Sequence, residues 1–206
     1  MEVKLIALTR YLGGSGSPEE LLEYAGRVCY RSEPKGNPGG FLRRRLKEGH
    51  ESIIEHACAT FEISGVSRAC THQLVRHRIA SYSQESQRYV DMSSPQFVTP
   101  PDIEASPEAK AAYERFLSTV SSAYSELRAF GINKEDARFV LPNAAATRIV
   151  VTMNFRSWRH VIRERGLNPA AQWEIRELAL RVLDELYRVA PNVFQDLVDE
   201  RTKQQA

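Results

Sequence analysis

The densest group of ligand-binding side chains in the sequence lies between Arg76 and Tyr89. This segment carries three arginines within thirteen residues, interleaved with five hydroxyl side chains and two amides. Guanidinium groups bind phosphate bidentately, and hydroxyls and amides supply further hydrogen bonds. The composition therefore suits a phosphorylated ligand such as a nucleotide. A solvated basic turn would have the same composition, so the segment alone leaves both alternatives open.

Arg165 is a second candidate for chemistry. Apolar residues recur at helical spacing from Arg156 to Arg165, and Gly166 follows. A fixed cation can stabilise negative charge that develops on a substrate. A cation at the end of a helix is also favoured by the macrodipole alone, and this second interpretation remains open.

Ser86 and four histidines could support hydrolysis, but their spacing organises no catalytic centre. The histidines follow neither an HExxH nor a two-histidine-carboxylate pattern, so no metal site is expected and a metal hydrolase is a weak alternative. No His or Asp stands at a diagnostic spacing to activate Ser86, which favours a substrate hydrogen bond over nucleophilic attack. The four histidines are His50, His56, His72 and His77.

The glycines of Gly13–Gly16 are expected to form a loop rather than a phosphate cradle. They fit neither GxGxxG nor GxxxxGK[ST], which gives little support to a Rossmann-type flavin site. Ser17, Pro18 and Glu20 follow, and they predict a capped helix start with a capping box.

Length and composition indicate one domain over residues 1–206, since 42% of the residues are hydrophobic and 26% are charged. Three cysteines without CxxC spacing indicate a reducing compartment. No signal peptide or membrane span is visible, so a cytoplasmic protein without a membrane partner is expected. A nucleic-acid-binding module, suggested by Arg43-Arg44-Arg45, is a weaker alternative because the net charge is only +2.

Helices and strands are mixed along the chain without regular βαβ alternation, which predicts an α+β fold with a mixed sheet core and long helices. Strands are expected over Val3–Leu8, Ala59–Ser64 with Gly65 ending the strand, and Ile149–Met153. Helices are expected over Ser17–Cys29, Phe41–Glu48, Val66–His77, Ser106–Phe130, Asn133–Leu141, Arg156–Arg165 and Asn168–Val189. Arg76 and Arg78 then lie near a helix C-terminus.

The ordered motifs resemble the flavin-dependent thymidylate synthases. Arg76-His77-Arg78, seven residues and then Ser86 match the signature of that family, and Arg88-Tyr89 continues it. Further pieces fall in family order over nearly the whole chain: Gly49-His50-Glu51-Ser52 with Glu55-His56, Arg138 before Val140-Leu141-Pro142, Asn154-Phe155-Arg156-Ser157-Trp158, Arg165, and Gln172-Trp173-Glu174-Ile175.

The resemblance implies an enzyme that converts dUMP to dTMP, with FAD as cofactor, NADPH as reductant and methylene-tetrahydrofolate as carbon donor, and that releases tetrahydrofolate. It also implies a homotetramer in which several subunits build each active site. The expected FAD contacts are Ser52, Arg76, His77, Arg78, Gln84, Asn154, Phe155, Arg156 and His160. The expected substrate contacts are Gln73, Arg76, Gln84, Glu85, Ser86, Gln87, Arg88, Arg138 and Arg165, with His50 beside the folate and the flavin ring.

By the same resemblance Arg165 is the catalytic residue, because a fixed cation beside uracil N3 and O2 stabilises the charge that makes C5 electron-rich. The chain departs from many relatives at Ser83-Gln84, where they carry Asn-Glu, and from some at His160, where they carry Asn. The side chains at both positions can still form hydrogen bonds, so these departures affect details of ligand contact rather than the expected activity.

Overall fold

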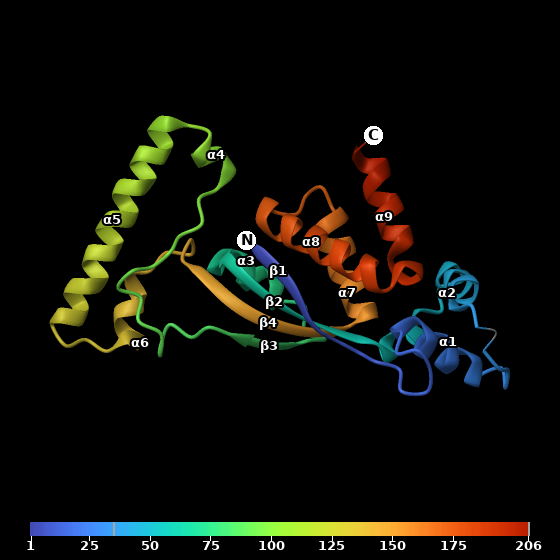
Figure 1. Cartoon of the computed structure of the whole chain (residues 1–206). Helices are drawn as coiled ribbons and strands as arrows, with labels where there is room; N and C mark the ends of the chain where they lie inside the picture. Colours follow the sequence, from blue (N-terminus) through green and yellow to red (C-terminus); the bar gives the residue numbers. More distant parts are fainter. Residues whose placement is uncertain (35, 206) are drawn as a thin grey trace. The chain divides into compact units, whose positions relative to one another are not determined.

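Four strands form one antiparallel sheet in the order β1-β2-β4-β3. The strands are β1 (Glu2–Leu8), β2 (Cys58–Ser67), β3 (Ser81–Gln84) and β4 (Ala146–Asn154). The computed structural model describes residues 1–34 and 36–205. Strands and helices are mixed (Figure 1), and the predicted α+β class is confirmed.

The described residues group into two compact units, and each of the four strands contributes residues to both. The first unit comprises Met1–Glu2, Ile63–Gln73 and Ser83–Ile149. The second comprises Val3–Glu62, Leu74–Tyr82 and Val150–Ala206.

The second unit holds most of the apolar core. Its helices are α1 (Pro18–Val28), α2 (Pro38–Lys47), the 3-10 helix η1 (Glu51–His56), α7 (Phe155–Val161), the π-helix η3 (Ile162–Leu167), α8 (Trp173–Val189) and α9 (Pro191–Gln205). Helix α8 packs against α9 and η3. Its buried residues recur every three or four positions, from Ile175 to Leu186, as an amphipathic helix requires.

Helix α7 is anchored to the sheet by Trp158. The indole ring is buried edge-on against Phe61 with ring centroids 5.1 Å apart, and its Nε1 donates to the Ala59 carbonyl at 3.1 Å. Phe155, at the start of the same helix, packs edge-on against Phe194 of α9 at 5.3 Å. These contacts fix the helix that carries several candidate ligand-binding side chains.

The first unit has a smaller core. It contains α3 (Arg68–Leu74), except Leu74, and α4 (Pro101–Glu104), α5 (Pro107–Ala129), α6 (Lys134–Ala137) and the 3-10 turn η2 (Arg138–Val140). Tyr124 of α5 is buried with Met92 and Ala137, and its hydroxyl accepts from the Met92 amide at 3.2 Å. This cluster holds the segment that begins at Arg138.

Several predicted boundaries are confirmed and others are wrong. Ser17 and Ser106 accept from Glu19 N at 3.2 Å and from Ala109 N at 3.3 Å, as predicted for N-caps. Glu20, however, accepts from the amide and hydroxyl of Ser15 and does not complete a box with Ser17. Gly65 does not end β2, because its positive φ of 67° bends a strand that continues to Ser67.

The expected start of a helix at Asn168 is also wrong. The Asn168 side chain accepts from Ala170 N at 3.0 Å and makes a turn instead. Helix α8 starts at Trp173, where the Gln172 side chain accepts from Glu174 N and Ile175 N at 3.0 and 3.3 Å. Strand β3 and helices α4 and α9 were not predicted. Among the described residues, no helix is long and apolar enough to cross a membrane.

Candidate functional site

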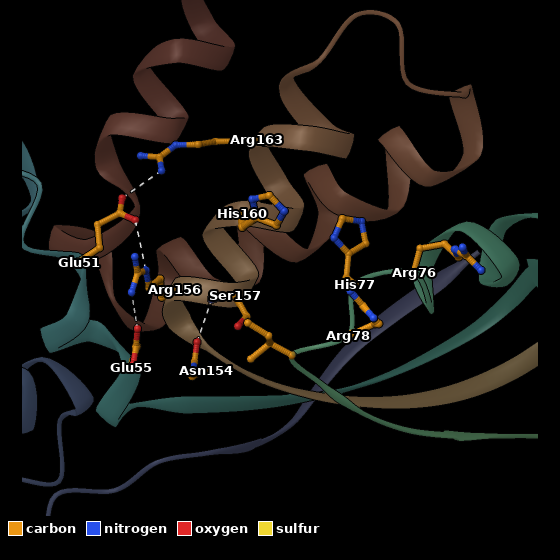
Figure 2. A pocket seen from close by; sticks show the side chains of 11 residues that line it. Glu51, Glu55, Arg76, His77, Arg78, Asn154, Arg156, Ser157, His160 and Arg163 are labelled. Carbon is orange, nitrogen blue, oxygen red and sulfur yellow. Dashed lines mark hydrogen bonds and ion pairs between the residues drawn. The ribbon is translucent and has the colours of Figure 1, made fainter.

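A cationic pocket of about 660 Å³ lies within the second unit (Figure 2). Its wall comes from η1, the turn after α3, the start of α7, and η3. Eleven residues line it: Glu51, Glu55, Arg76, His77, Arg78, Ile79, Asn154, Arg156, Ser157, His160 and Arg163. The turn after α3 and the start of α7 are separated by about seventy residues of sequence and are brought together here.

Helix α7 presents one face to this pocket because of how it starts. The Asn154 side chain accepts from Ser157 N at 2.8 Å and caps the helix. Arg156 and His160, one turn apart, both line the pocket. Trp158 and Val161 are buried on the other side. The helix thus has one side toward the pocket, with Arg156 and His160, and one side in the core.

His77 lies at the centre of a small polar cluster. Its Nε2 accepts a hydrogen bond from Arg165 Nε at 3.1 Å. Its ring meets the His160 ring edge-on, with centroids 5.6 Å apart. Burial first, and then the charges of Arg165 and His160, lower the pKa of His77 from 6.5 to about 4. His77 is therefore a neutral hydrogen-bonding group at physiological pH.

Carboxylates from η1 contact the arginines of the pocket. Arg156 Nη1 lies 2.5 Å from Glu55 Oε1, and its Nε lies 3.8 Å from Glu51 Oε2. Arg163 Nη1 donates to Glu51 Oε1 at 3.0 Å. Figure 2 shows Arg156 between the two glutamates. Four arginines face two glutamates around the pocket, so the lining carries an excess of positive charge suited to an anion.

The first unit contains a second cationic pocket, of about 300 Å³. Arg68, Gln87 and Arg138 line it together with Phe139, Leu141, Pro142 and Asn143. Burial first, and then the charge of Arg138, lower the pKa of Arg68. Two arginines close enough to oppose each other's charge make a site for an anion.

Glu135 organises two predicted phosphate ligands in the same unit. Arg88 Nε lies 3.0 Å from the Glu135 carboxylate, and Arg138 Nε donates to the Glu135 carbonyl at 3.1 Å. Both bonds engage Nε, so the terminal nitrogens of each arginine are the donors proposed below for a ligand. The structure thus brings together Arg88 and Arg138, which are fifty residues apart in sequence.

Hydrogen bonds to α3 and β4 hold the end of β3 and the residue after it. Gln84 Nε2 donates to the hydroxyls of Thr71 and Thr147 at 2.9 and 3.3 Å. Ser86 Oγ accepts from the Arg88 amide at 3.3 Å, and the Glu85 amide donates to the Arg148 carbonyl at 2.9 Å. Gln73, the second-last residue of α3, donates weakly to the Ala69 carbonyl of its own helix at 3.5 Å.

Comparison with known proteins gives the family. The model of the thymidylate synthase complementing proteins matches residues 7–192. A flavin-dependent thymidylate synthase of Mycobacterium marinum is 41% identical to this chain, over 95% of the chain and 89% of that protein. This chain belongs to the flavin-dependent thymidylate synthase family. Enzymes of the same name from Mycobacterium sp. (strain JLS) and Mycobacterium tuberculosis are 42% and 41% identical over the same shares.

Of the residues expected beside FAD or its ring, Ser52, Gln84, Phe155 and His50 do not line the large pocket. Ser52 is exposed on η1, and the side chain of His50 is 55% exposed, 3.9 Å from Glu48. Phe155 is fully buried, and its amide donates to the Ala57 carbonyl at 2.8 Å. A ring packed in the core cannot reach a ligand, so a contact of Phe155 is limited to its backbone carbonyl.

The predicted ligands of this thymidylate synthase family member divide between the two units. The second unit holds Ser52, His50, the Arg76–Arg78 signature, Asn154, Phe155, Arg156, His160 and Arg165. The first unit holds Gln73, Gln84, Glu85, Ser86, Gln87, Arg88 and Arg138. Apart from Arg165, the residues expected to contact the substrate nucleotide but not FAD therefore share one unit.

Several residues that line the two pockets had no ligand role in the sequence analysis, among them Arg163, Ser157, Glu55 and Arg68. Arg163 and Ser157 line the large pocket, and Arg163 follows Arg156 by seven residues on one helical face, a spacing that could have indicated it. Glu55 stood in a motif of the family without an assigned role. Arg68 lies ten residues before Arg78 and carried no sequence signal.

Proposed function

We propose that this chain is a flavin-dependent thymidylate synthase that methylates dUMP reductively to dTMP. The carbon donor is methylene-tetrahydrofolate, and NADPH reduces the enzyme through FAD. The observation that carries the proposal is the cationic pocket of the second unit, where the Arg76-His77-Arg78 signature meets Asn154, Arg156 and His160 of another segment. Family membership over 95% of the chain supports the same activity.

The lining of the pocket fits part of FAD. A diphosphate needs several cationic donors, and Arg76, Arg78, Arg156 and Arg163 supply them. Neutral His77 adds a hydrogen-bonding edge without further charge, and the imidazole of His160 lies beside it on the pocket wall. When bound, FAD supplies the reducing hydride of the reaction.

No protein thiol is assigned to the uracil ring. A thiolate is the nucleophilic form of cysteine. Burial raises the pKa of Cys58, which disfavours that form, and Cys70 is completely buried. We therefore assign no covalent bond between the protein and uracil, and the residues expected to contact the ring bind and polarise it.

Arg165 is the residue proposed to polarise uracil. Its Nε is held by His77, so the orientation of the guanidinium plane is fixed through this bond. The two terminal nitrogens are the donors that we assign to O2 and the N3 side of the ring. A preorganised planar cation at this edge stabilises the charge that builds up as C5 becomes nucleophilic.

The substrate phosphate is assigned to the first unit. Arg88 and Arg138 are the two forks that would hold a phosphate dianion, each through charge-assisted bonds of about 1.5–3 kcal/mol. Arg68 lines the same pocket as Arg138 and adds a third cation. Gln87 lines that pocket too, and we assign Gln73, Gln84, Glu85 and Ser86 of the same unit to further contacts with the nucleotide.

The proposal includes a cytoplasmic homotetramer that works without nucleic acid or membrane. Phe116, Phe130 and Phe139 are 52%, 80% and 83% exposed, and exposed rings of this kind support self-association. A nucleic-acid-binding role is less well supported because the net charge of the chain is only +2.

The proposed function is tested by product analysis. Purified protein is incubated without oxygen with dUMP, methylene-tetrahydrofolate and NADPH, and nucleotides and folates are separated. We expect equal amounts of dTMP and tetrahydrofolate, and no product when NADPH is omitted. Formation of dihydrofolate in place of tetrahydrofolate would show that the folate, rather than the flavin, supplied the reducing hydride.

A further inference from the structure

Glu55 places a negative charge on the wall of a pocket whose other charged groups are mostly arginines. It lies in η1, lines the pocket, and its side chain is 43% exposed. Its carboxylate contacts Nη1 of Arg156, whose side chain is 51% exposed. Both side chains of this ion pair are therefore open to solvent and to a ligand.

The atom that Glu55 engages gives it a different role from Glu51. Glu55 contacts a terminal nitrogen of Arg156, which is one of the donors that a bidentate phosphate contact requires. Glu51 faces the Nε edge of Arg156 at 3.8 Å, is only 23% exposed, and also binds Arg163. At Arg156, therefore, Glu51 faces only the Nε edge, whereas Glu55 occupies a terminal nitrogen; the terminal nitrogen that Glu51 engages belongs to Arg163.

From this geometry we propose that Glu55 competes with the flavin phosphates for Arg156 and so lowers the affinity of the enzyme for FAD. The inference rests on the proposed function, because it assigns the large pocket to FAD. An exposed ion pair is weak, and a phosphate offers Arg156 stronger charge-assisted bonds, so FAD displaces or shares the contact. The remaining carboxylate then repels the bound phosphates.

The test compares Glu55→Gln with the wild type. Gln keeps the size of the side chain and removes its charge. The matched control is Glu177→Gln on α8, because Glu177 is also 43% exposed and lies 2.6 Å from an arginine, Arg181, that is 49% exposed. Neither Glu177 nor Arg181 lines the pocket. The full chain is stripped of flavin and titrated with FAD and, separately, with riboflavin, which has no phosphate.

We expect Glu55→Gln to bind FAD about three- to fivefold more tightly than the wild type, the size expected for removing one exposed charge. Glu55→Ala should shift FAD affinity in the same direction, which covers the case that Gln keeps the contact with Arg156. Glu177→Gln should leave the Kd for FAD unchanged. Riboflavin should bind the wild type and Glu55→Gln equally.

Unchanged or weaker FAD binding by both Glu55 variants would overturn the inference and make Glu55 a support for Arg156. An equal gain for riboflavin would also overturn it, because the phosphates would not be involved. Wild-type protein that binds FAD but shows no gain on substitution contradicts only the role of Glu55. Wild-type protein that binds no FAD contradicts the proposed function as well.

Discussion

Arg165 donates from Nε to Nε2 of His77 at 3.1 Å. Arginine has no acceptor, so this bond requires an unprotonated Nε2 on His77. The lowered pKa of His77, about 4, agrees with that state because burial and the charge of Arg165 both disfavour the imidazolium. One hydrogen bond thus joins the residue proposed to polarise uracil to a residue of the proposed flavin pocket.

The first prediction concerns stability at acid pH. His77 has a folded pKa of about 4 and an ordinary value of 6.5, so the unfolded chain binds a proton that the folded chain refuses. The stability that depends on neutral His77 is fully present above about pH 6.5 and is lost as the pH falls toward 4. Because His77 is only half-buried, we expect the loss to be on the order of 1 kcal/mol rather than the full value of the shift.

This loss is measured by urea unfolding at fixed protein and flavin concentration between pH 7 and pH 4. His77→Gln keeps a hydrogen-bond acceptor for Arg165 but cannot titrate. Its free energy of unfolding should fall less steeply with pH than that of the wild type. Parallel slopes for the two proteins would show that His77 does not titrate differently on folding.

The second prediction concerns geometry at Arg165. Lys keeps the charge but replaces a planar fork by a point donor, so it cannot bind His77 and both uracil groups in one plane. We expect Arg165→Lys to be nearly as damaging as Arg165→Ala, by on the order of a hundredfold in the step where dUMP and methylene-tetrahydrofolate together oxidise the reduced flavin. Reduction of the flavin by NADPH should suffer less. Single-turnover absorbance traces separate the two half-reactions. A wild-type rate of flavin oxidation in the Lys variant would contradict the polarising role and leave Arg165 as a cation that stabilises the end of its helix.

The third prediction concerns the colour of the protein. His77 and Arg78 line the large pocket, so His77→Ala and Arg78→Ala remove donors that we assign to FAD. Both variants should be pale after desalting, with reduced absorbance of oxidised flavin for each subunit. Arg88→Ala, in the first unit, is the matched control and should stay yellow. Full flavin occupancy in both pocket variants would contradict the assignment of the flavin to the pocket of the second unit.

The fourth prediction concerns substrate affinity. Arg88→Ala and Arg138→Ala each remove one proposed phosphate fork, and we expect the Kd for dUMP to rise about ten- to a hundredfold. Added salt should weaken binding to the wild type in the same direction. Calorimetric titration of flavin-loaded protein with dUMP measures the effect. Loss of flavin with unchanged dUMP affinity would mean that the two groups of arginines have been assigned to the wrong ligands.

The sequence predicted helix starts well where the capping residue acts locally. Ser17 and Ser106 cap the next turn of their own helices, so a short window of sequence contains the interaction. Asn168 misled the prediction because the same side chain stabilises a turn equally well. Strand β3 was missed because four partly exposed polar residues have no apolar alternation, and only pairing with the neighbouring strand makes them a strand.

Candidate site residues that belong to a family motif could be predicted from the sequence. Residues that take part through ion pairs with distant parts of the chain could not. The cationic face of α7 followed from the spacing of Arg156 and His160. The contacts of Glu55 with Arg156 and of Glu135 with Arg88 join residues 101 and 47 positions apart. No local pattern encodes such pairs. Arg68 was missed for the same reason, since only the folded chain places it beside Arg138.

The central claim is that the hydride used to make the methyl group of dTMP comes from a flavin held by this chain. The most direct measurement mixes protein, reduced with one equivalent of NADPH and freed of excess nucleotide, with dUMP and methylene-tetrahydrofolate in the absence of oxygen. The account predicts that flavin absorbance near 450 nm returns, on the order of a typical enzyme turnover time, with one dTMP formed for each flavin oxidised. Flavin that stays reduced while dTMP forms, or that is oxidised without dTMP, would contradict it.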